Sequence, residues 1–522
     1  MELDDFGKLG VREDASEVHD VGKQYNDMID RIDMDRLGKK QELKRNFRLL
    51  SIFSFMCVAM STWVFVISAS TGGLAAGGTG GFISVYIVSS FVYFTVVLSL
   101  AEMSSIAPTA GGQYHWTSEF AHPKAQKFIS YIAGWLLTLS WLCGVTSGMF
   151  LSGQMAQGAI LITDTTFSAQ PYQVWLLVLA FAAGGFILNT IGARHLASLE
   201  IFVAAFFVLG YAANIIVFWV MSPKNSASEV FSTFTNGDGW SNFGFGILTA
   251  QTSALYLIIG SDGAAHMAEE TREASLNVPR GIIGSYLIGV ISGLVMLITF
   301  CFCFTSDALN SATGFAFMSV YQTTTGSNSA AKALTAILIV LTFFSATNFM
   351  ASASRQTYAF ARDGGLPFSK SIAKVSDRLN IPILAVFIAF AFVVLLSLID
   401  LGSYVAFSAI ISLQLIALFA TYEVAIGTLI YRRLFGPPLP ERRWSLGRAG
   451  LAVNVFAFIY GLFALAFIVL PGSPNPTTET MNWAPLIFVG VMLISLVYYF
   501  VGGRKNYIGP VKLVKNESDW TR

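Results

Sequence analysis

The chain has 522 residues, of which 54% are hydrophobic and 12% are charged, and its mean hydropathy is +0.62. Soluble domains carry about 25% charged residues, so this composition excludes an ordinary soluble protein and indicates an integral membrane protein. The formal net charge of +1 gives no general attraction to nucleic acid. The four cysteines and five histidines lack the spacing of a metal site or a disulfide framework, so we expect no metal and no cofactor.

Two polar tails flank the apolar part of the chain. Residues 1–47 are charged and contain no apolar signal-peptide core, so we predict a soluble, disordered tail. Lys and Arg accumulate in its last stretch, directly before the first apolar run. Residues 504–522 form a second polar, basic tail.

Between the tails, twelve apolar segments are long enough to cross a hydrocarbon core of about 30 Å. They cover residues 48–76, 80–105, 124–160, 172–192, 195–221, 245–268, 281–305, 332–361, 382–400, 403–431, 449–471 and 483–503. The third segment exceeds one crossing, so we expect it to tilt or to extend beyond the bilayer. We divide the chain into a five-helix repeat over 48–221, a second five-helix repeat over 245–431, and helices 11 and 12 over 449–503.

The connections between these segments alternate in charge. Starting from the N-terminal tail, every second connection carries Lys or Arg, whereas the intervening ones hold only Lys224 and Lys332 at their margins. The positive-inside rule then places the basic connections and both tails in the cytoplasm. An odd number of spans would break this alternation, so the sequence predicts an all-α protein with twelve transmembrane helices.

Two of the segments contain polar interruptions. The first holds Met60-Ser61-Thr62-Trp63, and the sixth holds Gly260-Ser261-Asp262-Gly263. Each segment opens a block of five spans, and matched interruptions in two halves point to the binding site of an inverted-repeat transporter. For Ser61 and Thr62 the alternative is ordinary helix packing by small hydroxyl residues. The candidate substrate-binding residues are Ser61, Thr62, Trp63, Tyr256, Gly260, Ser261 and Asp262.

Four motifs occur in a characteristic order, at residues 61–78, 108–114, 258–280 and 355–367. Together they resemble those of the amino acid–polyamine–organocation transporter superfamily. The run from Gly260 to Glu270 is most similar to its amino acid/choline transporter branch, which is largely fungal and includes γ-aminobutyrate and choline permeases. The resemblance implies a five-plus-five inverted repeat with broken helices 1 and 6 and two extra helices. It also implies alternating-access transport across the plasma membrane.

Asp262 has two alternative roles. Its carboxylate could bind the ammonium end of a substrate when ionised, or carry a proton when neutral. Alternatively, it caps the broken helix by accepting hydrogen bonds from N–H groups after Gly263. Trp63 and Tyr256 are candidates for cation–π contact with the substrate, and some relatives place an aromatic that closes over the substrate near Tyr256. The alternative for both aromatic residues is packing.

Two further ionisable residues are candidates for coupling to a proton, which is the driving ion we favour. Glu200 lies about six residues into the fifth span, near the position where some proton-coupled relatives carry a lysine. A structural pairing with Arg194 or His195 is the alternative. His266 follows Asp262 by four residues, roughly on the same helical face, where an imidazole suits a proton relay. A hydrogen-bonded core histidine is the alternative.

These features favour a secondary active transporter of a small amine-bearing solute such as an amino acid, γ-aminobutyrate or choline. Gln154 and Asn348 could line its pathway, although buried amides also bridge helices. No phosphate-binding glycine loop supports nucleotide-driven transport, and no histidine cluster supports a membrane enzyme. Two alternatives stay open, namely an exporter of a cationic secondary metabolite or polyamine and a non-transporting nutrient sensor. The substrate, the direction of transport and the oligomeric state are not determined by the sequence.

Overall fold

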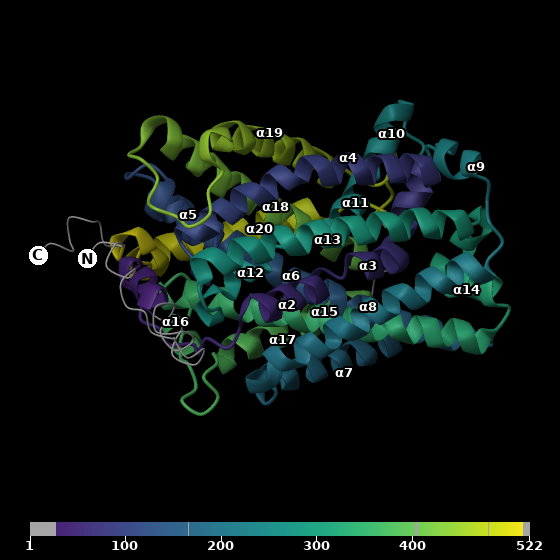
Figure 1. Cartoon of the computed structure of the whole chain (residues 1–522), viewed down its shortest axis with the longest axis horizontal. Coiled ribbons are helices and arrows are strands. Elements are labelled where there is room, and N and C mark those ends of the chain that lie inside the picture. The colour runs from purple at the N-terminus through teal and green to yellow at the C-terminus, as the bar shows by residue number, and fades with distance from the viewer. Residues whose placement is uncertain (1–27, 165, 402–405, 479, 515–522) are drawn as a thin grey trace, which may run out of the picture.

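The computed structural model describes residues 28–514 except 165, 402–405 and 479. In this part of the chain, long helices run side by side along the longest axis of the molecule, and no β-strand is present (Figure 1). The all-α fold class predicted from the sequence is confirmed.

The helices that form the bundle follow the predicted apolar segments. Their bounds are α2 Leu49–Met60, α3 Thr62–Ala69, α4 Thr71–Ile106, α6 Gln126–Leu161, α7 Pro171–Thr190, α8 Leu196–Met221, α10 Phe243–Thr249, α11 Gln251–Ile258, α12 Gly263–His266, α13 Ala274–Cys303, α15 Asn328–Arg362, α17 Ile383–Ser397, α18 Ala406–Phe435, α19 Gly450–Ile468 and α20 Ala484–Tyr498. Among the described residues, 11 helical segments are long and apolar enough to span a membrane. The twelfth predicted segment is α17, whose 15 residues continue into the short helix Leu398–Leu401.

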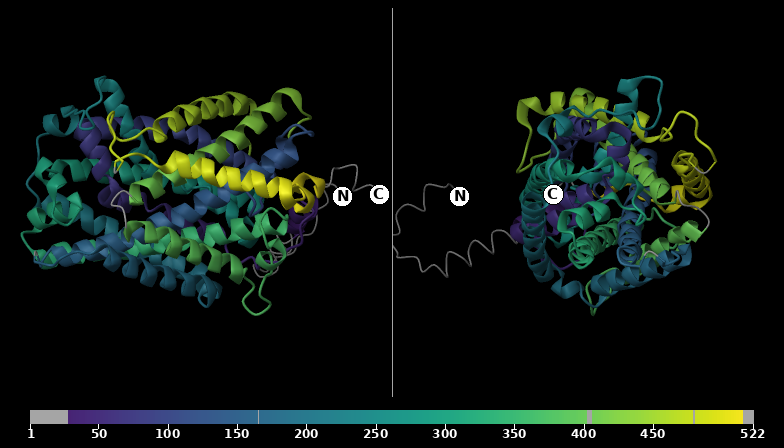
Figure 2. Two further views of the ribbon diagram at one scale, coloured as in Figure 1. Left: turned by 180° about the vertical axis from the view of Figure 1, so that it is seen from behind. Right: turned by 90° about the vertical axis from the view of Figure 1, so that its right-hand side faces the viewer.

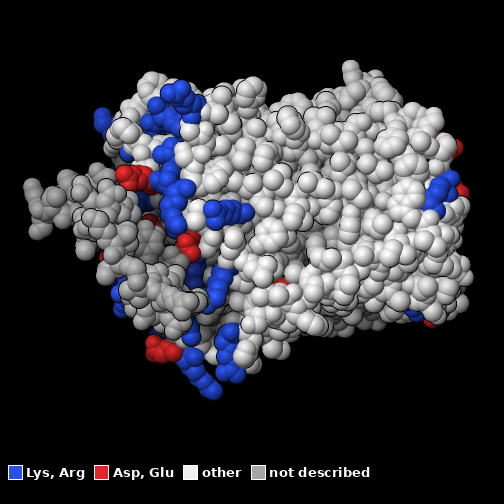
Figure 3. Space-filling model, in the orientation of Figure 1, with Lys and Arg blue, Asp and Glu red and all other residues white. Residues whose placement is uncertain are grey.

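Short helices close the two ends of the bundle. The bounds of the ones used below are α5 Gln113–Phe120, α9 Ala227–Ser232, α14 Ala316–Thr325, α16 Ser369–Ile372, α21 Arg504–Asn506, η2 Ala193–His195 and η3 Ala268–Glu270. Lys and Arg side chains gather at the end that holds α5 and α16, which we call the basic end (Figures 1 and 3). The opposite end, with α9 and α14, is called the distal end.

The two interruptions lie inside the bundle rather than on its surface, since Ser61 and residues 259–262 are buried. The Leu49–Ala69 segment is mostly buried, as are α6 and α18, whereas α20 is largely exposed and lies on the outside (Figure 2). The third and eighth spans, α6 and α15, pack against each other, and α2 packs against α8, α13 and α15. The third and eighth spans, which hold corresponding positions in the two predicted five-span blocks, thus meet inside the bundle.

The disordered tail predicted over residues 1–47 is wrong for its second half. Residues 28–36 are helical, and Met34, Leu37, Leu43 and Phe47 are buried against the basic end. The backbone of Phe47 pairs with that of residues 270–272 on both sides of an isolated bridge. These four apolar side chains, dispersed in a charged stretch, supply the burial that orders it. Residues 1–27 and 515–522 of the predicted tails lie outside the described residues.

Candidate functional site

The first break separates α2 from α3 at Ser61, whose φ of 37° is left-handed. A helix end leaves backbone carbonyls without intrahelical partners. Here, α15 supplies a donor to one of them, since the Ser345 hydroxyl donates to the Ala59 carbonyl. Asn348 Nδ2, also on α15, donates to the Phe55 carbonyl inside α2 at 3.1 Å. The eighth span therefore holds the end of the first half-helix in place.

The second break follows α11 and contains Gly260, whose φ is +100°. A Cβ atom placed on Gly260 would lie 2.8 Å from Cζ of Phe349 on α15. Only glycine combines this backbone conformation with so close a ring. The role of Gly260 is therefore to let the chain turn beneath Phe349.

Gly260→Ala is expected to lower the free energy of unfolding by about 2 to 5 kcal/mol, because it adds backbone strain to a steric clash. Thermal unfolding of the purified protein in detergent measures the loss. Gly239→Ala is the matched control, since Gly239 also has a positive φ (+74°) but no atom within 4 Å of its added Cβ. Equal losses in the two variants would show that Phe349 imposes no constraint.

A small cavity of about 20 Å³ lies between the two breaks, and we call it the closed cavity because it is too small to admit an amino acid. It is lined by Met60, Phe65, Gly144, Ser147, Gly148, Tyr256, Ile259, Ser345, Ala346, Phe349 and Gln414. The Tyr256 hydroxyl donates to Ser147 Oγ at 3.3 Å, and Ser147 donates to Gln414 Oε1 at 3.0 Å. None of these lining side chains is charged. The cavity thus combines aromatic faces with neutral oxygen atoms and has room for about one water molecule.

A larger vestibule of about 610 Å³ lies on the distal side of this cavity. Its lining includes the predicted pathway residue Gln154, together with Gln157 and the 312–315 loop. Tyr256 lines both spaces, and its ring meets Phe65 edge-on with centroids 5.7 Å apart. The Tyr256–Phe65 pair therefore separates the closed cavity from the vestibule.

Asp262 is fully buried but does not line the closed cavity. Its Oδ2 accepts a hydrogen bond from Gln113 Nε2 at 2.6 Å, and its Oδ1 accepts one from the Tyr422 hydroxyl at 2.8 Å. The side chain makes no capping bond to α12, so the capping alternative is wrong. Asp262 instead joins the second break to α5 and α18, and Tyr93 extends the network at 3.5 Å from Tyr422.

Glu200 is a fully buried residue of α8, and its side chain contacts α15. Its Oε2 accepts a hydrogen bond from Asn348 Nδ2 at 2.9 Å, while its Oε1 has no partner among the described residues. The alternative pairing with Arg194 or His195 is wrong, because those residues belong to the exposed helix η2. Asn348 bridges three spans through Glu200 and the α2 carbonyl, and it does not line the closed cavity.

His266 is held by the connection that precedes α5. Its Nδ1 lies 2.9 Å from the Ala110 carbonyl, so this nitrogen carries the hydrogen, and its ring meets Trp141 edge-on at 4.9 Å. Its Nε2 has no partner in the described part of the chain. This arrangement matches the alternative of a hydrogen-bonded core histidine.

Three of the predicted binding residues beside the breaks face away from the closed cavity. The Trp63 ring packs against Phe207 and Tyr211 of α8, at 5.5 and 5.8 Å. Thr62 faces α13, where its Oγ1 would lie 2.7 Å from a Cβ added at Gly289. The Ser61 hydroxyl donates back to a carbonyl of α2. In this conformation these side chains stabilise the break, and Tyr256 is the predicted binding residue that reaches the cavity.

Buried ion pairs close the basic end beneath the breaks. Arg362 donates to both oxygens of Glu269 at 2.7 and 2.8 Å, and Arg355 donates to Glu270 at 2.6 Å. Lys39 of the N-terminal segment pairs with Asp363. Burial alone would raise the pKa of Glu269, but the Arg362 guanidinium and a backbone N–H hold that pKa at about 2. We call these three pairs the basal ion-pair layer.

Several residues at the centre were not identified from the sequence. Gln113 lies within the 108–114 motif, and Ser147, Gln414 and Tyr422 lie inside long apolar helices. A polar side chain in a spanning helix is itself a signal, because it requires a partner or a cavity. The partner, however, comes from another helix far away in the sequence.

The sequence profile described as amino acid permease matches residues 47–493. This chain belongs to the amino acid permease family. It is 30% identical over 495 residues to the amino-acid permease BAT1 homolog of Oryza sativa subsp. japonica, with 91% of this chain and 94% of that protein covered. It is 29% identical over 490 residues to an amino-acid permease of Schizosaccharomyces pombe, covering 92% and 90%. The permease is therefore a multi-pass membrane transporter rather than an enzyme.

Comparison with solved structures agrees with the family. The permease resembles a manganese transporter of Eremococcus coleocola with a TM-score of 0.51 at 13% identity, over 88% of this chain and 95% of that one. At this identity the likeness concerns the fold alone. The match to the amino acid permease profile and the permease relatives confirm the resemblance to the amino acid–polyamine–organocation superfamily noted from the motifs. The amino acid/choline branch within it stays a prediction.

Proposed function

We propose that this permease is a secondary active transporter of a small amine-bearing solute, driven by protons and working by alternating access. One observation carries the proposal. The closed cavity lies between the two breaks, with the Tyr256–Phe65 pair between it and the distal vestibule and the buried Glu269–Arg362 pair of the basal ion-pair layer towards the basic end. Such unequal closure on two sides is what an alternating-access site requires.

The lining of the closed cavity favours a cationic amine as the recognised group. The rings of Phe65, Tyr256 and Phe349 can attract an ammonium group, and Ser147 and Gln414 offer neutral oxygen atoms. Backbone N–H groups at the breaks can receive a carboxylate. Amino acids, γ-aminobutyrate and choline therefore remain the candidates, and the permease names of the relatives favour an amino acid. The small present volume requires Tyr256 to move when the solute enters.

Two buried carboxylates are suited to carry the driving proton. Glu200 and Asp262 are fully buried and are hydrogen-bonded to neutral groups, not to Lys or Arg, within the described residues. A buried carboxylate without a cation is stable mainly in its neutral form. We propose Asp262 as the principal carrier, because it belongs to the second break itself. Protonation there would loosen its bonds to Gln113 and Tyr422 and change how α12 is held.

We also propose that the basic end is cytoplasmic and that the protein lies in the plasma membrane. The gathering of Lys and Arg at that end supports this orientation through the positive-inside rule (Figure 3). The distal vestibule then faces the outside, and the N-terminal segment over residues 28–47 lies on the cytoplasmic side.

Uptake by reconstituted vesicles tests the function. Purified protein in proteoliposomes, with an inward proton gradient, is given labelled alanine and then competed with γ-aminobutyrate, choline, arginine and spermidine. We expect accumulation of a labelled solute that a proton ionophore abolishes. Vesicles that bind a solute from this panel without accumulating it would indicate a sensor instead. Accumulation only under an outward gradient would indicate export.

Tyr256→Ala is expected to connect the vestibule with the closed cavity. The measurement is the labelling rate of Ala346→Cys, a cavity residue, by a membrane-impermeant maleimide in a background without the four native cysteines. We expect labelling to become at least about tenfold faster, because a gating barrier of about 1.4 kcal/mol or more is removed.

Tyr256→Phe serves as the control for this experiment. It keeps the ring against Phe65 and removes only the 3.3 Å hydrogen bond to Ser147. We expect its labelling rate to stay close to that of the parent. Equal rates in all three proteins would show that Tyr256 is not the barrier.

A further inference from the structure

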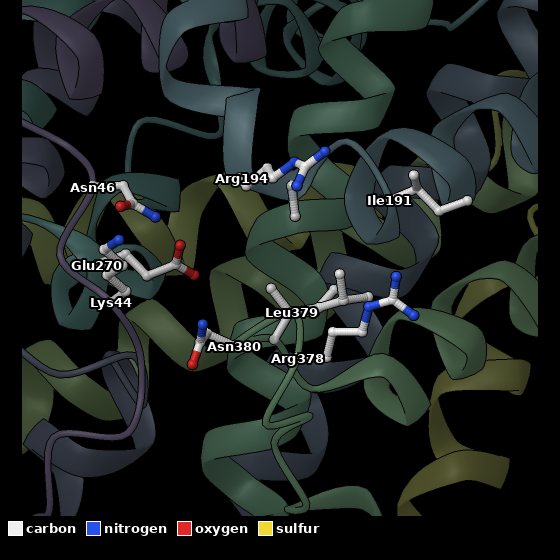
Figure 4. Close-up of a pocket in the computed structure, with 10 residues that line it drawn as sticks. Lys44, Asn46, Ile191, Arg194, Glu270, Arg378, Leu379 and Asn380 are labelled. Atoms are coloured by element: carbon white, nitrogen blue, oxygen red, sulfur yellow. The ribbon is translucent and has the colours of Figure 1, made fainter.

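A third, separate pocket of about 600 Å³ opens at the basic end. It is formed by four segments that are far apart in the sequence, namely the N-terminal segment, the α7–α8 connection, η3 and the loop after α16. Its lining residues are Lys44, Asn46, Ile191, Ala193, Arg194, Glu270, Arg378, Leu379, Asn380 and Ile381. In Figure 4, Lys44, Asn46 and Glu270 stand on one side of the space, with Arg194 and Arg378 on the other.

The charges of this pocket are unbalanced. Lys44, Arg194 and Arg378 each contribute a cation, and none of them has a carboxylate partner among the described residues. The one acidic residue in the lining, Glu270, is already paired with Arg355 at 2.6 Å. Like charges brought together without a counter-ion repel one another. The pocket is therefore complementary to an anion.

The pocket also borders the apolar face of the bundle. Ile191 lines it and is 68% exposed, and Ile187, one turn earlier on α7, is 52% exposed. These two side chains continue the lipid-facing surface of α7 to the edge of the pocket. On the opposite side, the amides of Asn46 and Asn380 can donate hydrogen bonds to oxygen atoms. An occupant that is apolar on one side and anionic on the other fits both walls.

We propose that this pocket binds the phosphate-bearing headgroup of an anionic phospholipid. Basic pockets between spanning helices on the cytoplasmic side are suited to such headgroups, and guanidinium groups bind phosphate oxygens in bidentate fashion. Arg194 and Arg378 hold the phosphate, Lys44 adds a third charge, and the acyl chains lie along Ile191 and Ile187. Glu270, kept by Arg355, shapes the wall without contacting the anion.

Binding at this place also has a structural consequence. Lys44 and Asn46 belong to the segment whose Phe47 pairs with the backbone of residues 270–272, next to the basal ion-pair layer. A bound headgroup links that segment to η2 and to the loop after α16. The lipid therefore stabilises the docked N-terminal segment and the closed basic end together.

Lipid binding to the full-length protein in detergent micelles tests this proposal. The probes are dioctanoyl phosphatidylinositol 4-phosphate, dioctanoyl phosphatidylcholine, and the soluble headgroup inositol 1,4-bisphosphate, and the readout is the thermal unfolding midpoint across a titration. We expect the phosphoinositide to raise the midpoint and the phosphatidylcholine to leave it unchanged. The double variant Arg194→Gln/Arg378→Gln should weaken the apparent affinity roughly 30-fold, because two phosphate-binding charges are lost.

The double variant Arg448→Gln/Arg504→Gln is the matched control. It removes the same charge from exposed arginines outside the pocket lining, so affinity should stay near that of the parent. An equal loss in both double variants, or equal stabilisation by the two lipids, would overturn the site. Inositol 1,4-bisphosphate has no acyl chains. If it raises the unfolding midpoint as strongly as the lipid does, and if Arg194→Gln/Arg378→Gln removes that effect, the ligand of the pocket is a free phosphate compound and the lipid proposal is wrong. Each readout is independent of transport, so a failure here leaves the proposed function untouched.

Discussion

Asp262→Asn is expected to abolish proton-driven accumulation while leaving the protein folded. The amide has the size of the carboxylate, and its oxygen can still accept from Tyr422. The Nδ2 of the new asparagine can donate a hydrogen bond to Gln113 Oε1 if the Gln113 side-chain amide rotates by half a turn. Gln113 Oε1 has no other partner within the described residues. What the variant loses is the ability to bind and release a proton. A gradient of one pH unit is worth about 1.4 kcal/mol per proton, or tenfold accumulation. The accumulation ratio should therefore fall from about 10 to about 1.

Solute exchange without a gradient distinguishes a lost proton from a lost binding site. We expect Asp262→Asn vesicles to exchange labelled for unlabelled solute at equal internal and external pH. Glu200→Gln is the companion variant, because Asn348 can bond to a glutamine oxygen in the same way. If Asp262→Asn retains full accumulation and full pH dependence while Glu200→Gln loses them, Glu200 is the proton carrier and the role proposed for Asp262 is wrong.

The breaks themselves could be predicted from the sequence because their cause is local. Glycine, serine and aspartate inside an apolar run are poor helix formers whatever surrounds them. The structure places chain breaks at Ser61, within the predicted interruption over 60–63, and at residues 259–262, which overlap the predicted interruption over 260–263. The alternation of basic connections also depends only on sequence order. The number and type of spans could therefore be predicted from local signals.

The partners of the break residues could not be predicted, because they come from distant parts of the chain. Asp262 bonds to residues 149 and 160 positions away, and Asn348 joins helices that are 148 and 293 positions away. Hydropathy identifies a buried polar group but not the helix that it faces. Trp63 shows the same limit, since an aromatic ring beside a break can turn to either side.

The folded part of the N-terminal segment illustrates a second limit. Asp30 accepts hydrogen bonds from the backbone N–H groups of Glu273 and Ala274, at 3.0 and 3.1 Å, and so caps α13 from outside that helix. Sequence signals for caps consider only the residue directly before a helix. A charged stretch such as 28–47 therefore resembles a solvated tail until the tertiary partners of its few apolar and acidic residues are known.

Glu269→Gln is expected to destabilise the closed basic end by about 3 to 5 kcal/mol, because it leaves the buried guanidinium of Arg362 without its counter-charge. Thermal unfolding in detergent at pH 7 measures the loss, and trypsin cleavage at Lys39 and Lys40 reports whether the N-terminal segment detaches. Glu441→Gln removes an exposed carboxylate at the same end and should change neither readout. A loss no larger than that of the control would show that the pair does not hold this end closed.

The pH dependence of the same pair gives an independent check with a definite sign. The pKa of Glu269 is held at about 2, below its ordinary value of 4.5, so its contribution to stability is complete above pH 4.5 and is lost as the pH falls toward 2. The difference amounts to about 3 kcal/mol. The parent protein should therefore lose more stability over this range than Glu269→Gln, which has no carboxylate to protonate at that position. Parallel losses in the two proteins would mean that another group, and not the Glu269–Arg362 pair, controls the acid sensitivity of the basal ion-pair layer.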